Sequence, residues 1–263
     1  MLNTQNPIPE NVFAEKVTEV KHYTNSLFKF RVTRPKSFRF RSGEFCMIGL
    51  PNSENPIYRA YSIASPFWDK ELEFFSIKVQ GGPLTEHLQR IKIGDTLLIR
   101  KKTTGTLLLE ALLPGTRLYL LSTGTGIAPF ASLIRDPEIY EKFNKVILIQ
   151  TTRERMELSY ANEIVRELLD DPLIGDFSSQ FIFYPMTTRE ASDHMGRITD
   201  TMSSGEFFSR TGLPPIQATE DRFMICGSIA MLKDCVAMAE AFGLKEGTNH
   251  APGTYVVERA FVS

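Results

Sequence analysis

The sequence predicts two domains, an antiparallel six-stranded β-barrel followed by an α/β domain with a doubly wound parallel sheet. Three observations predict this division. Residues 12–101 contain short strand-like runs separated by turns rich in glycine and proline. In the second half, strand-like runs alternate with helical ones, as in a parallel sheet. A hinge with a turn signal at Pro114-Gly115 separates the two patterns, so we expect domains at 1–113 and 114–263.

The composition is that of a globular protein without a strong charge bias. Hydrophobic residues make up 42% of the 263 residues, charged residues make up 23%, and the formal net charge is −1. A net charge this close to zero provides no global attraction to nucleic acid or to an anionic membrane, so we expect neither as a partner. No apolar run reaches the ~18 residues that a membrane-spanning helix needs.

The cysteines and the N-terminus indicate the compartment. The three cysteines, Cys46, Cys226 and Cys235, show no C-x-x-C spacing and leave an odd one, which favours a reducing environment. The first ten residues have neither a basic region nor an apolar core, so no signal peptide is expected. We expect a cytoplasmic protein and a monomer. No metal site is expected, because no cluster of His, Cys and carboxylates has ligand spacing.

Six strands and one helix are expected in the first domain. Apolar and polar residues nearly alternate in 27–32 and 74–79, and turn-forming residues cluster between such runs. This density of short strands is typical of a small antiparallel barrel. The helix is expected at 83–90. The predicted strands are 12–20, 27–33, 45–50, 59–64, 72–79 and 95–101.

The fourth of these strands carries residues suited to a nucleotide. On a strand, Arg59 and Tyr61 share one face, while Ser62 lies on the other. A fixed cation beside a flat aromatic ring can hold a phosphate and stack on a planar ring. An ordinary barrel strand with a surface arginine is the alternative.

A second candidate phosphate site lies at the start of the predicted helix. Gly81-Gly82 allows close approach of the backbone, the helix N-terminus favours an anion, and Thr85 adds a hydroxyl donor. A simple turn explains the local sequence equally well.

The third feature is the turn at Gly124-Thr125-Gly126. An apolar strand precedes it and a helix-like segment from Ile127 follows, which is the arrangement that presents backbone N–H groups to a phosphate. Pro129 occupies the position of the third glycine of the usual dinucleotide fingerprint, so the turn is not an ordinary Rossmann one. Glycines that serve only tight packing are the alternative.

The second domain is expected to contain five strands and three helices. Ser228 is the expected N-cap of the last helix, whose apolar stripe is predicted at Ile229, Leu232, Val236 and Ala239. The predicted strands are 118–122, 146–150, 180–184, 222–226 and 254–258, and the predicted helices are 127–135, 158–170 and 229–242.

Arginines after the second and third strands of this domain favour NADPH over NADH. An NAD site usually places an acidic residue after the second strand, but this chain has Arg153 there, and Arg189 and Arg197 follow the third strand. Arginines at this edge suit a 2′-phosphate through bidentate hydrogen bonds. The alternative is that they are solvated and paired with Glu154 and Glu190.

Together these motifs resemble those of a known family. Arg59-Ala-Tyr61-Ser62-Ile-Ala-Ser65 resembles the R-x-Y-S-x-x-S flavin motif of the ferredoxin–NADP reductase superfamily. Gly82-Pro-Leu-Thr85 is similar to the second flavin-phosphate segment of its bacterial branch, and Thr123-Gly-Thr-Gly-Ile-Ala-Pro-Phe130 to its nicotinamide-domain turn. The motifs lie in the family's order, and the resemblance extends over nearly the whole chain. It implies a barrel that binds FAD non-covalently, followed by a domain that binds NADP(H).

The resemblance also implies roles for individual residues. The residues implied for FAD are Arg59, Ala60, Tyr61, Ser62, Ser76, Ile77, Lys78, Gly82, Pro83, Leu84, Thr85, Thr125, Ala260, Phe261, Val262 and Ser263. Those implied for NADP are Thr125, Gly126, Thr152, Arg153, Thr188, Arg189, Glu190, Arg197, Cys226, Gly227 and Ser228. Those implied for the reaction itself are Tyr61 on the isoalloxazine, Ser62 near its N5, Cys226 beside the nicotinamide and Ala260 near the flavin.

The resemblance implies an enzyme that exchanges electrons between NADPH and ferredoxin or flavodoxin. An acidic carrier is expected to dock on basic residues, with 100–102 or Arg39 and Arg41 as candidates. Unlike the plant-type enzymes, this chain does not end in an aromatic residue that could cover the flavin ring. One alternative is the reductase component of an oxygenase, although the three cysteines cannot supply a Cys₄ iron–sulfur site. Another is a flavin-binding redox sensor without turnover.

Overall fold

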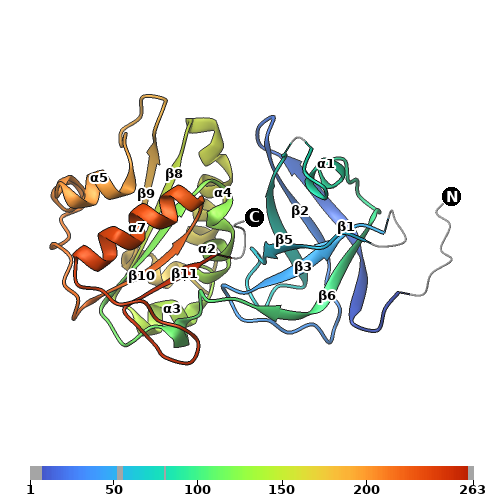
Figure 1. The fold of residues 1–263 in the computed structure, drawn as a ribbon, viewed down its shortest axis with the longest axis horizontal. Helices are drawn as coiled ribbons and strands as arrows, with labels where there is room; N and C mark the ends of the chain where they lie inside the picture. Colours follow the sequence, from blue (N-terminus) through green and yellow to red (C-terminus); the bar gives the residue numbers. More distant parts are fainter. Residues whose placement is uncertain (1–7, 52–55, 80, 260–263) are drawn as a thin grey trace.

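The computed structural model describes residues 8–51, 56–79 and 81–259. Two sheets divide the chain (Figure 1): a six-stranded sheet formed by strands up to residue 104, and a five-stranded sheet formed by strands from residue 117 onward. The predicted fold class is confirmed in both halves.

The first sheet is antiparallel throughout, with strand order β4-β3-β6-β1-β2-β5. Its strands are β1 (Val12–His22), β2 (Leu27–Thr33), β3 (Phe45–Gly49), β4 (Arg59–Ser62), β5 (Glu71–Ile77) and β6 (Thr96–Thr104). The sheet curves until its two edge strands meet: the hydroxyls of Tyr61 on β4 and Ser76 on β5 lie 3.0 Å apart. Just beyond β4, the amide of Ala64 donates to the carbonyl of Glu73 at 2.8 Å.

The helix of this domain is shorter than its sequence suggests. The helix α1 spans only Thr85–Leu88, and Gly81 before it has a φ of 72°. Leu84 and Leu88 are buried in the barrel core beside aromatic residues such as Phe30 and Phe74. The short helix thus places two apolar side chains in the core, one from its N-cap and one from its last residue.

The second sheet is parallel, with strand order β11-β10-β7-β8-β9. Its strands are β7 (Arg117–Thr123), β8 (Lys145–Thr152), β9 (Phe181–Thr187), β10 (Asp221–Cys226) and β11 (Tyr255–Glu258). Because all strands run the same way, their carboxyl ends meet at one edge, where ligands bind in doubly wound folds.

Helices cover both faces of this sheet. The helices are α2 (Ala128–Leu133), α3 (Pro137–Lys142), α4 (Ser159–Asp170), α5 (Ile198–Ser203), α6 (Glu206–Thr211) and α7 (Ile229–Ala241). Short 3₁₀ turns occur at η1 (Leu109–Ala111), η2 (Gly124–Ile127), η3 (Arg155–Leu158) and η4 (Gly175–Gln180). The helices α2, α3 and α4 pack on the face nearer the barrel, and α5, α6 and α7 pack on the other face (Figure 1).

Two details of the second half differ from the sequence-based expectation. Three helices of six residues each, α3, α5 and α6, are present in addition to the predicted ones. The side chain of Ser228 caps α7 as predicted, by accepting a hydrogen bond from the amide of Met231. The predicted stripe was wrong at Ile229, which is 63% exposed. The buried face of α7 includes Leu232 and Ala239 of the predicted stripe, together with Met231, Cys235 and Met238.

The two halves share a continuous apolar core. Leu27, Ala64 and Phe75 of the barrel belong to the same buried cluster as Ile127 and Tyr160 of the α/β half. Burial of apolar surface across this junction favours one arrangement of the two halves.

Candidate functional site

A cavity of about 610 Å³ lies where the barrel meets the carboxyl edge of the parallel sheet. This volume is within the range of sites for small ligands and cofactors. The barrel residues predicted to contact FAD that line it are Arg59, Ala60, Tyr61, Ser62, Ser76, Ile77, Gly82, Pro83, Leu84 and Thr85. The nucleotide-domain residues predicted as ligand contacts that line it are Thr125, Gly126, Thr152, Arg153, Thr188, Cys226, Gly227 and Ser228. The structure thus brings both predicted sets to one site.

The aromatic wall of the barrel side is held in place by its neighbours. Tyr61 is half-buried, its hydroxyl lies 3.0 Å from that of Ser76, and its ring packs edge-on against Phe74 with centroids 6.4 Å apart. Burial raises the pKa of Tyr61, and the hydrogen bond with Ser76 only partly offsets this. Tyr61 is therefore a neutral, fixed ring at physiological pH. Arg59, on the same face of β4, is exposed at the cavity edge.

The segment 82–85 approaches the cavity closely. A Cβ added to Gly82 would lie 2.1 Å from the hydroxyl oxygen of Thr85, so only glycine fits there without displacing that side chain. Thr85 donates to the carbonyl of Val79 at 3.3 Å. Lys78, predicted on the same side, does not line the cavity.

The glycine turn, residues 124–126, is packed against the end of a neighbouring strand. Gly124 has a φ of 55°, and its carbonyl accepts a hydrogen bond from Gln150 at 2.9 Å. A Cβ on Gly126 would lie 2.3 Å from the carbonyl oxygen of Cys226, and one on Gly227 would lie 2.3 Å from the hydroxyl oxygen of Thr123. These glycines let the ends of β7 and β10 touch backbone to backbone, so the packing alternative and the ligand hypothesis are compatible.

Cys226 ends β10 at the cavity and is 1% exposed. Burial, together with the charge of Glu258, raises the pKa of its thiol well above the ordinary value. The side chain is therefore a neutral thiol, and it contributes shape and polarizability to the site rather than a nucleophile. Cys46 and Cys235 are also buried and free.

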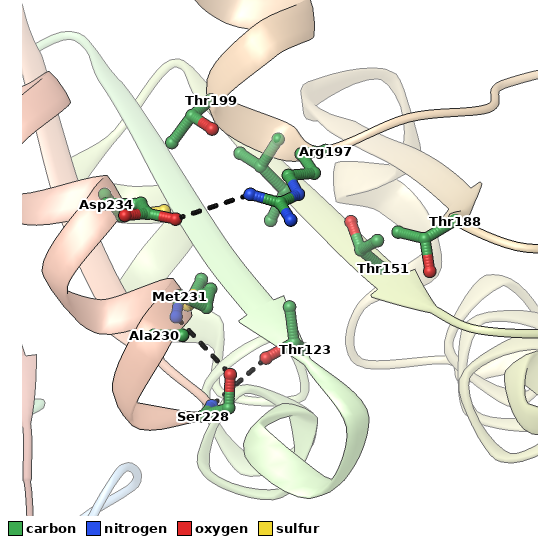
Figure 2. Close-up of a pocket in the computed structure, with 11 residues that line it drawn as sticks. Thr123, Thr151, Thr188, Arg197, Thr199, Ser228, Ala230, Met231 and Asp234 are labelled. Atoms are coloured by element: carbon green, nitrogen blue, oxygen red, sulfur yellow. Dashed lines mark hydrogen bonds and ion pairs between the residues drawn. The ribbon is translucent and has the colours of Figure 1, made fainter.

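A smaller pocket adjoins the cavity on the side of α5 and α7 (Figure 2). Thr123, Thr151, Thr188 and Ser228 line it together with Arg197 and Asp234. Figure 2 shows the guanidinium of Arg197 directed across the pocket toward Asp234, and the two side chains lie 3.9 Å apart. Among the described residues, the buried hydroxyl of Thr151 has no hydrogen-bond partner. A buried polar group of this kind favours a polar ligand.

Arg189, the third arginine predicted for NADP, lines neither of these pockets. The amide of Arg189 donates to the carbonyl of Arg153 at 3.0 Å, which joins the loops after β8 and β9. Glu190 accepts from the amide of Arg155 at 2.7 Å. Within the described part of the chain, neither Arg153 nor Arg189 forms an ion pair with Glu154 or Glu190. The predictions for Ala260, Phe261, Val262 and Ser263 lie outside the described residues.

Sequence reasoning missed several residues of the site. Phe75 lines the cavity and stacks on Tyr160, with ring centroids 4.0 Å apart and planes at 11°. Thr151, Glu157 and Asp234 also line the pockets. The position of Thr151 directly before Thr152 at a strand end could have indicated it. Phe75 and Asp234 carry no such signal, because their neighbours at the site come from distant segments.

The comparisons with known proteins agree with this arrangement. Residues 14–106 match the family described as "Oxidoreductase FAD-binding domain", and residues 120–237 match "Oxidoreductase NAD-binding domain". The chain is 53% identical to the flavodoxin/ferredoxin–NADP reductase of Rhodobacter capsulatus, over 99% of this chain and 98% of that protein. The chain belongs to the ferredoxin/flavodoxin–NADP reductase family.

Other members of the family show how far the likeness extends. The ferredoxin–NADP reductase of Azotobacter vinelandii is 50% identical, over 96% of this chain and 98% of that protein. A crystal structure of a ferredoxin NADP⁺ reductase from Neisseria gonorrhoeae with bound FAD and NADP superposes with a TM-score of 0.87. It is 32% identical, and the match covers 96% of this chain and all of that one. Among the described residues, no helix is both long and apolar enough to cross a membrane.

Proposed function

We propose that this protein is an FAD-dependent reductase that exchanges electrons between NADPH and ferredoxin or flavodoxin. The observation that carries the proposal is that β4, which carries the flavin motif, and the glycine turn line one and the same cavity. Bound FAD supplies the conversion between a two-electron hydride and single electrons, and the protein supplies binding and placement.

On the barrel side, the ring of Tyr61 is proposed to stack on the isoalloxazine, with Ser62 proposed to lie near its N5. Arg59 and the segment 82–85 are proposed to hold the FAD phosphates through charge-assisted and backbone hydrogen bonds. Ser76 keeps Tyr61 in position through the 3.0 Å contact between their hydroxyls. Ala60 and Ile77 add contact surface on the same wall.

On the nucleotide side, Arg153, Arg189 and Arg197 are proposed to select the 2′-phosphate. Thr152, Thr188 and Glu190 position the loops that carry them: the amide of Thr188, for example, donates to the carbonyl of Thr152 at 2.9 Å. Thr125 and Gly126 are proposed to contact the pyrophosphate or nicotinamide side. The residues at the end of β10, 226–228, close this part of the site.

Ferredoxin and flavodoxin are proposed as partners that dock on a basic surface of the barrel. The residues 100–102, within the second half of β6, expose three consecutive cations. The guanidinium of Arg100 lies 4.5 Å from the ring centre of Tyr58, which limits its freedom. Alanine at all three positions should lower the rate and the salt dependence of carrier reduction while NADPH oxidation by ferricyanide is unchanged. Unchanged carrier reduction would contradict this docking site.

The domain division at 113/114 is supported by the change from antiparallel to parallel pairing between β6 and β7. A cytoplasmic location is supported by the buried, free cysteines. A monomer is proposed, and sedimentation velocity would test it: a stable dimer at micromolar concentration would contradict it.

The experiment that tests the function is steady-state turnover of the purified protein. The protein should be yellow, with FAD released on denaturation, and should reduce ferricyanide with NADPH much faster than with NADH. Absence of FAD would contradict the proposal as a whole. A preference for NADH would contradict only the role of the arginines.

A further inference from the structure

One continuous segment connects the glycine turn to the barrel. It starts in η2, whose residues 124–126 lie in the cavity wall, continues through α2, and reaches Arg135 two residues after the end of that helix. Every residue of α2 is buried. The segment lies at the junction of the two halves (Figure 1). Because the segment is short and helical and its α2 part is buried throughout, we expect a displacement of one end to be transmitted to the other.

Arg135 fastens the far end of this segment to the barrel. Its guanidinium donates to the carbonyl of Ala64 at 2.5 Å and lies 3.5 Å from the carboxylate of Glu73. A third hydrogen bond, to the carbonyl of Ala131 at 2.8 Å, fixes the guanidinium against its own helix. The backbone carbonyl of Arg135 accepts from the indole of Trp68 at 3.3 Å. The planar guanidinium thus joins the helix to the barrel at two points.

Of the two points that Arg135 contacts, Glu73 lies on β5 and Ala64 lies just after β4, and both strands contribute to the cavity wall. Ala64 lies two residues after Ser62, and Glu73 lies two residues before Phe75. The same positions are joined to each other, since the amide of Ala64 donates to the carbonyl of Glu73. Arg135 therefore contacts two segments that continue the flavin-side wall, whereas the glycine turn at the other end of its segment forms the opposite wall.

The carboxylate of Glu73 is held in place from several directions. It lies 3.7 Å from the ammonium of Lys29, and it accepts a hydrogen bond from the hydroxyl of Tyr160 at 2.8 Å. Its side chain is only 4% exposed. Burial alone would raise the pKa of Glu73, but Arg135 and Lys29 outweigh this and the pKa is lowered. The carboxylate is therefore charged at physiological pH and provides a fixed anchor for Arg135.

We infer that Arg135 is a positioning residue for hydride transfer: its contacts with the barrel set the distance between the glycine turn and the flavin-side wall. The inference rests on the proposed function, because it assigns a role within that site. Hydride transfer depends steeply on the placement of its two reactants, and a 1 Å displacement can cost about 100-fold in rate. Arg135 itself does not line the cavity, so it acts through the backbone that it holds.

The test compares two arginines whose side chains have similar low exposure but different places in the fold. Arg135 is 10% exposed in its side chain and Arg117 is 11% exposed. Arg117 binds Asp221 at the opposite, amino-terminal end of the parallel sheet. Lysine in place of either arginine keeps the charge but loses the planar fork that serves two acceptors at once. Arg117→Lys is therefore the matched control for Arg135→Lys.

Three quantities are measured on each holoprotein: the rate of flavin reduction at saturating NADPH, the Kd for NADP⁺, and the backbone hydrogen exchange of residues 64–73. For Arg135→Lys we expect the rate to fall about 10-fold or more. The Kd should stay within about twofold, because the arginines proposed for the 2′-phosphate lie elsewhere. Exchange in 64–73 should become faster. Arg117→Lys should keep the wild-type rate and exchange in this segment, even where its melting temperature falls equally.

A second variant keeps the inference testable where Arg135→Lys does not fold. Tyr160→Phe removes one hydrogen bond to Glu73 and keeps the ring that stacks on Phe75. It should slow flavin reduction in the same direction by a smaller factor, with an unchanged Kd for NADP⁺. Wild-type reduction rates in the Arg135→Lys and Tyr160→Phe variants that fold would overturn the positioning role, as would equal slowing in Arg117→Lys. Failure of the wild-type protein to be reduced by NADPH would instead overturn the proposed function itself.

Discussion

The backbone of Gly126 touches the backbone of Cys226, so that a Cβ on Gly126 would lie 2.3 Å from the carbonyl oxygen of Cys226. Two strand ends that are far apart in the sequence thereby meet at the cavity. Only a residue without a side chain permits this contact, since real Cβ atoms do not approach an oxygen so closely. The contact brings the glycine turn and the cysteine at the end of β10 into one wall.

The first prediction concerns this contact. Gly126→Ala must displace either the glycine turn or the end of β10, because both colliding groups are backbone. We expect flavin reduction by NADPH to slow about 100-fold, and overpacking to cost about 1–3 kcal/mol of stability. Rapid-mixing kinetics and thermal unfolding measure the two effects. Gly175→Ala is the control, since its Cβ would lie 3.4 Å from the nearest atom. Equal effects in both variants would contradict the proposed cause.

The second prediction concerns the choice of NADPH. Arg197→Ala should raise KM for NADPH about 10- to 100-fold, which corresponds to the loss of about 1.5–3 kcal/mol from a charged hydrogen bond. KM for NADH should not change. Asp234→Asn should lower KM for NADPH, because it removes a negative charge 3.9 Å from Arg197 in the same pocket. Arg210→Ala, which removes an exposed partner of Glu206, should leave both values unchanged. A KM for NADPH that did not respond to Arg197→Ala would remove this residue from the site.

The third prediction concerns thiol reactivity. All three cysteines are buried and free, and burial raises the pKa of Cys235 to about 12. The native protein should therefore react very slowly with a thiol–disulfide exchange reagent, whereas the unfolded protein should titrate three thiols. Cys226→Ser should keep most of the turnover, because the side chain serves as a small neutral group. Rapid loss of activity on alkylation of native protein at Cys226 would show a reactive thiolate instead.

The fourth prediction concerns stability in acid. The pKa of Glu73 in the folded protein lies below its ordinary value of 4.5, so its stabilising contribution is present above that value and is lost as the pH falls through the folded pKa. Near neutral pH, Glu73→Gln should lower the free energy of unfolding by roughly 3–5 kcal/mol, because Arg135 loses its buried partner. The gap between the two proteins should narrow in acid, where Glu73 is protonated and resembles glutamine. Denaturant unfolding at a series of pH values checks this, and a gap independent of pH would contradict it.

Features set by local sequence could be predicted. The strand bounds of β2 were predicted to the residue, because Leu27–Thr33 alternates and is flanked by turn residues. The cap of α7 by Ser228 was also predictable, since a serine before an apolar helical run is a strong local signal. The cavity-lining positions of Arg59 and Tyr61 were predicted from the motif on β4, but strand alternation did not separate them from Ala60 and Ser62, which line the cavity too.

Features that depend on distant partners could not be predicted. Phe74 and Phe75 are adjacent and chemically alike, yet Phe74 packs inside the barrel while Phe75 packs against Tyr160 of the other half. Arg135 was expected only as the end of a helix, because Ala64 and Glu73 are not its neighbours in sequence. The helices α5 and α6 are too short to show an apolar period.

The central claim is that one cavity holds a flavin and receives hydride from NADPH in preference to NADH. Anaerobic mixing of the purified holoprotein with each nucleotide, followed by ferredoxin or flavodoxin in a second mixing step, tests this claim most directly. We predict rapid loss of flavin absorbance with NADPH, much slower loss with NADH, and recovery of the absorbance when an oxidised carrier is added. A flavin that NADPH leaves oxidised, or a reduced protein that neither carrier can reoxidise, would contradict the account.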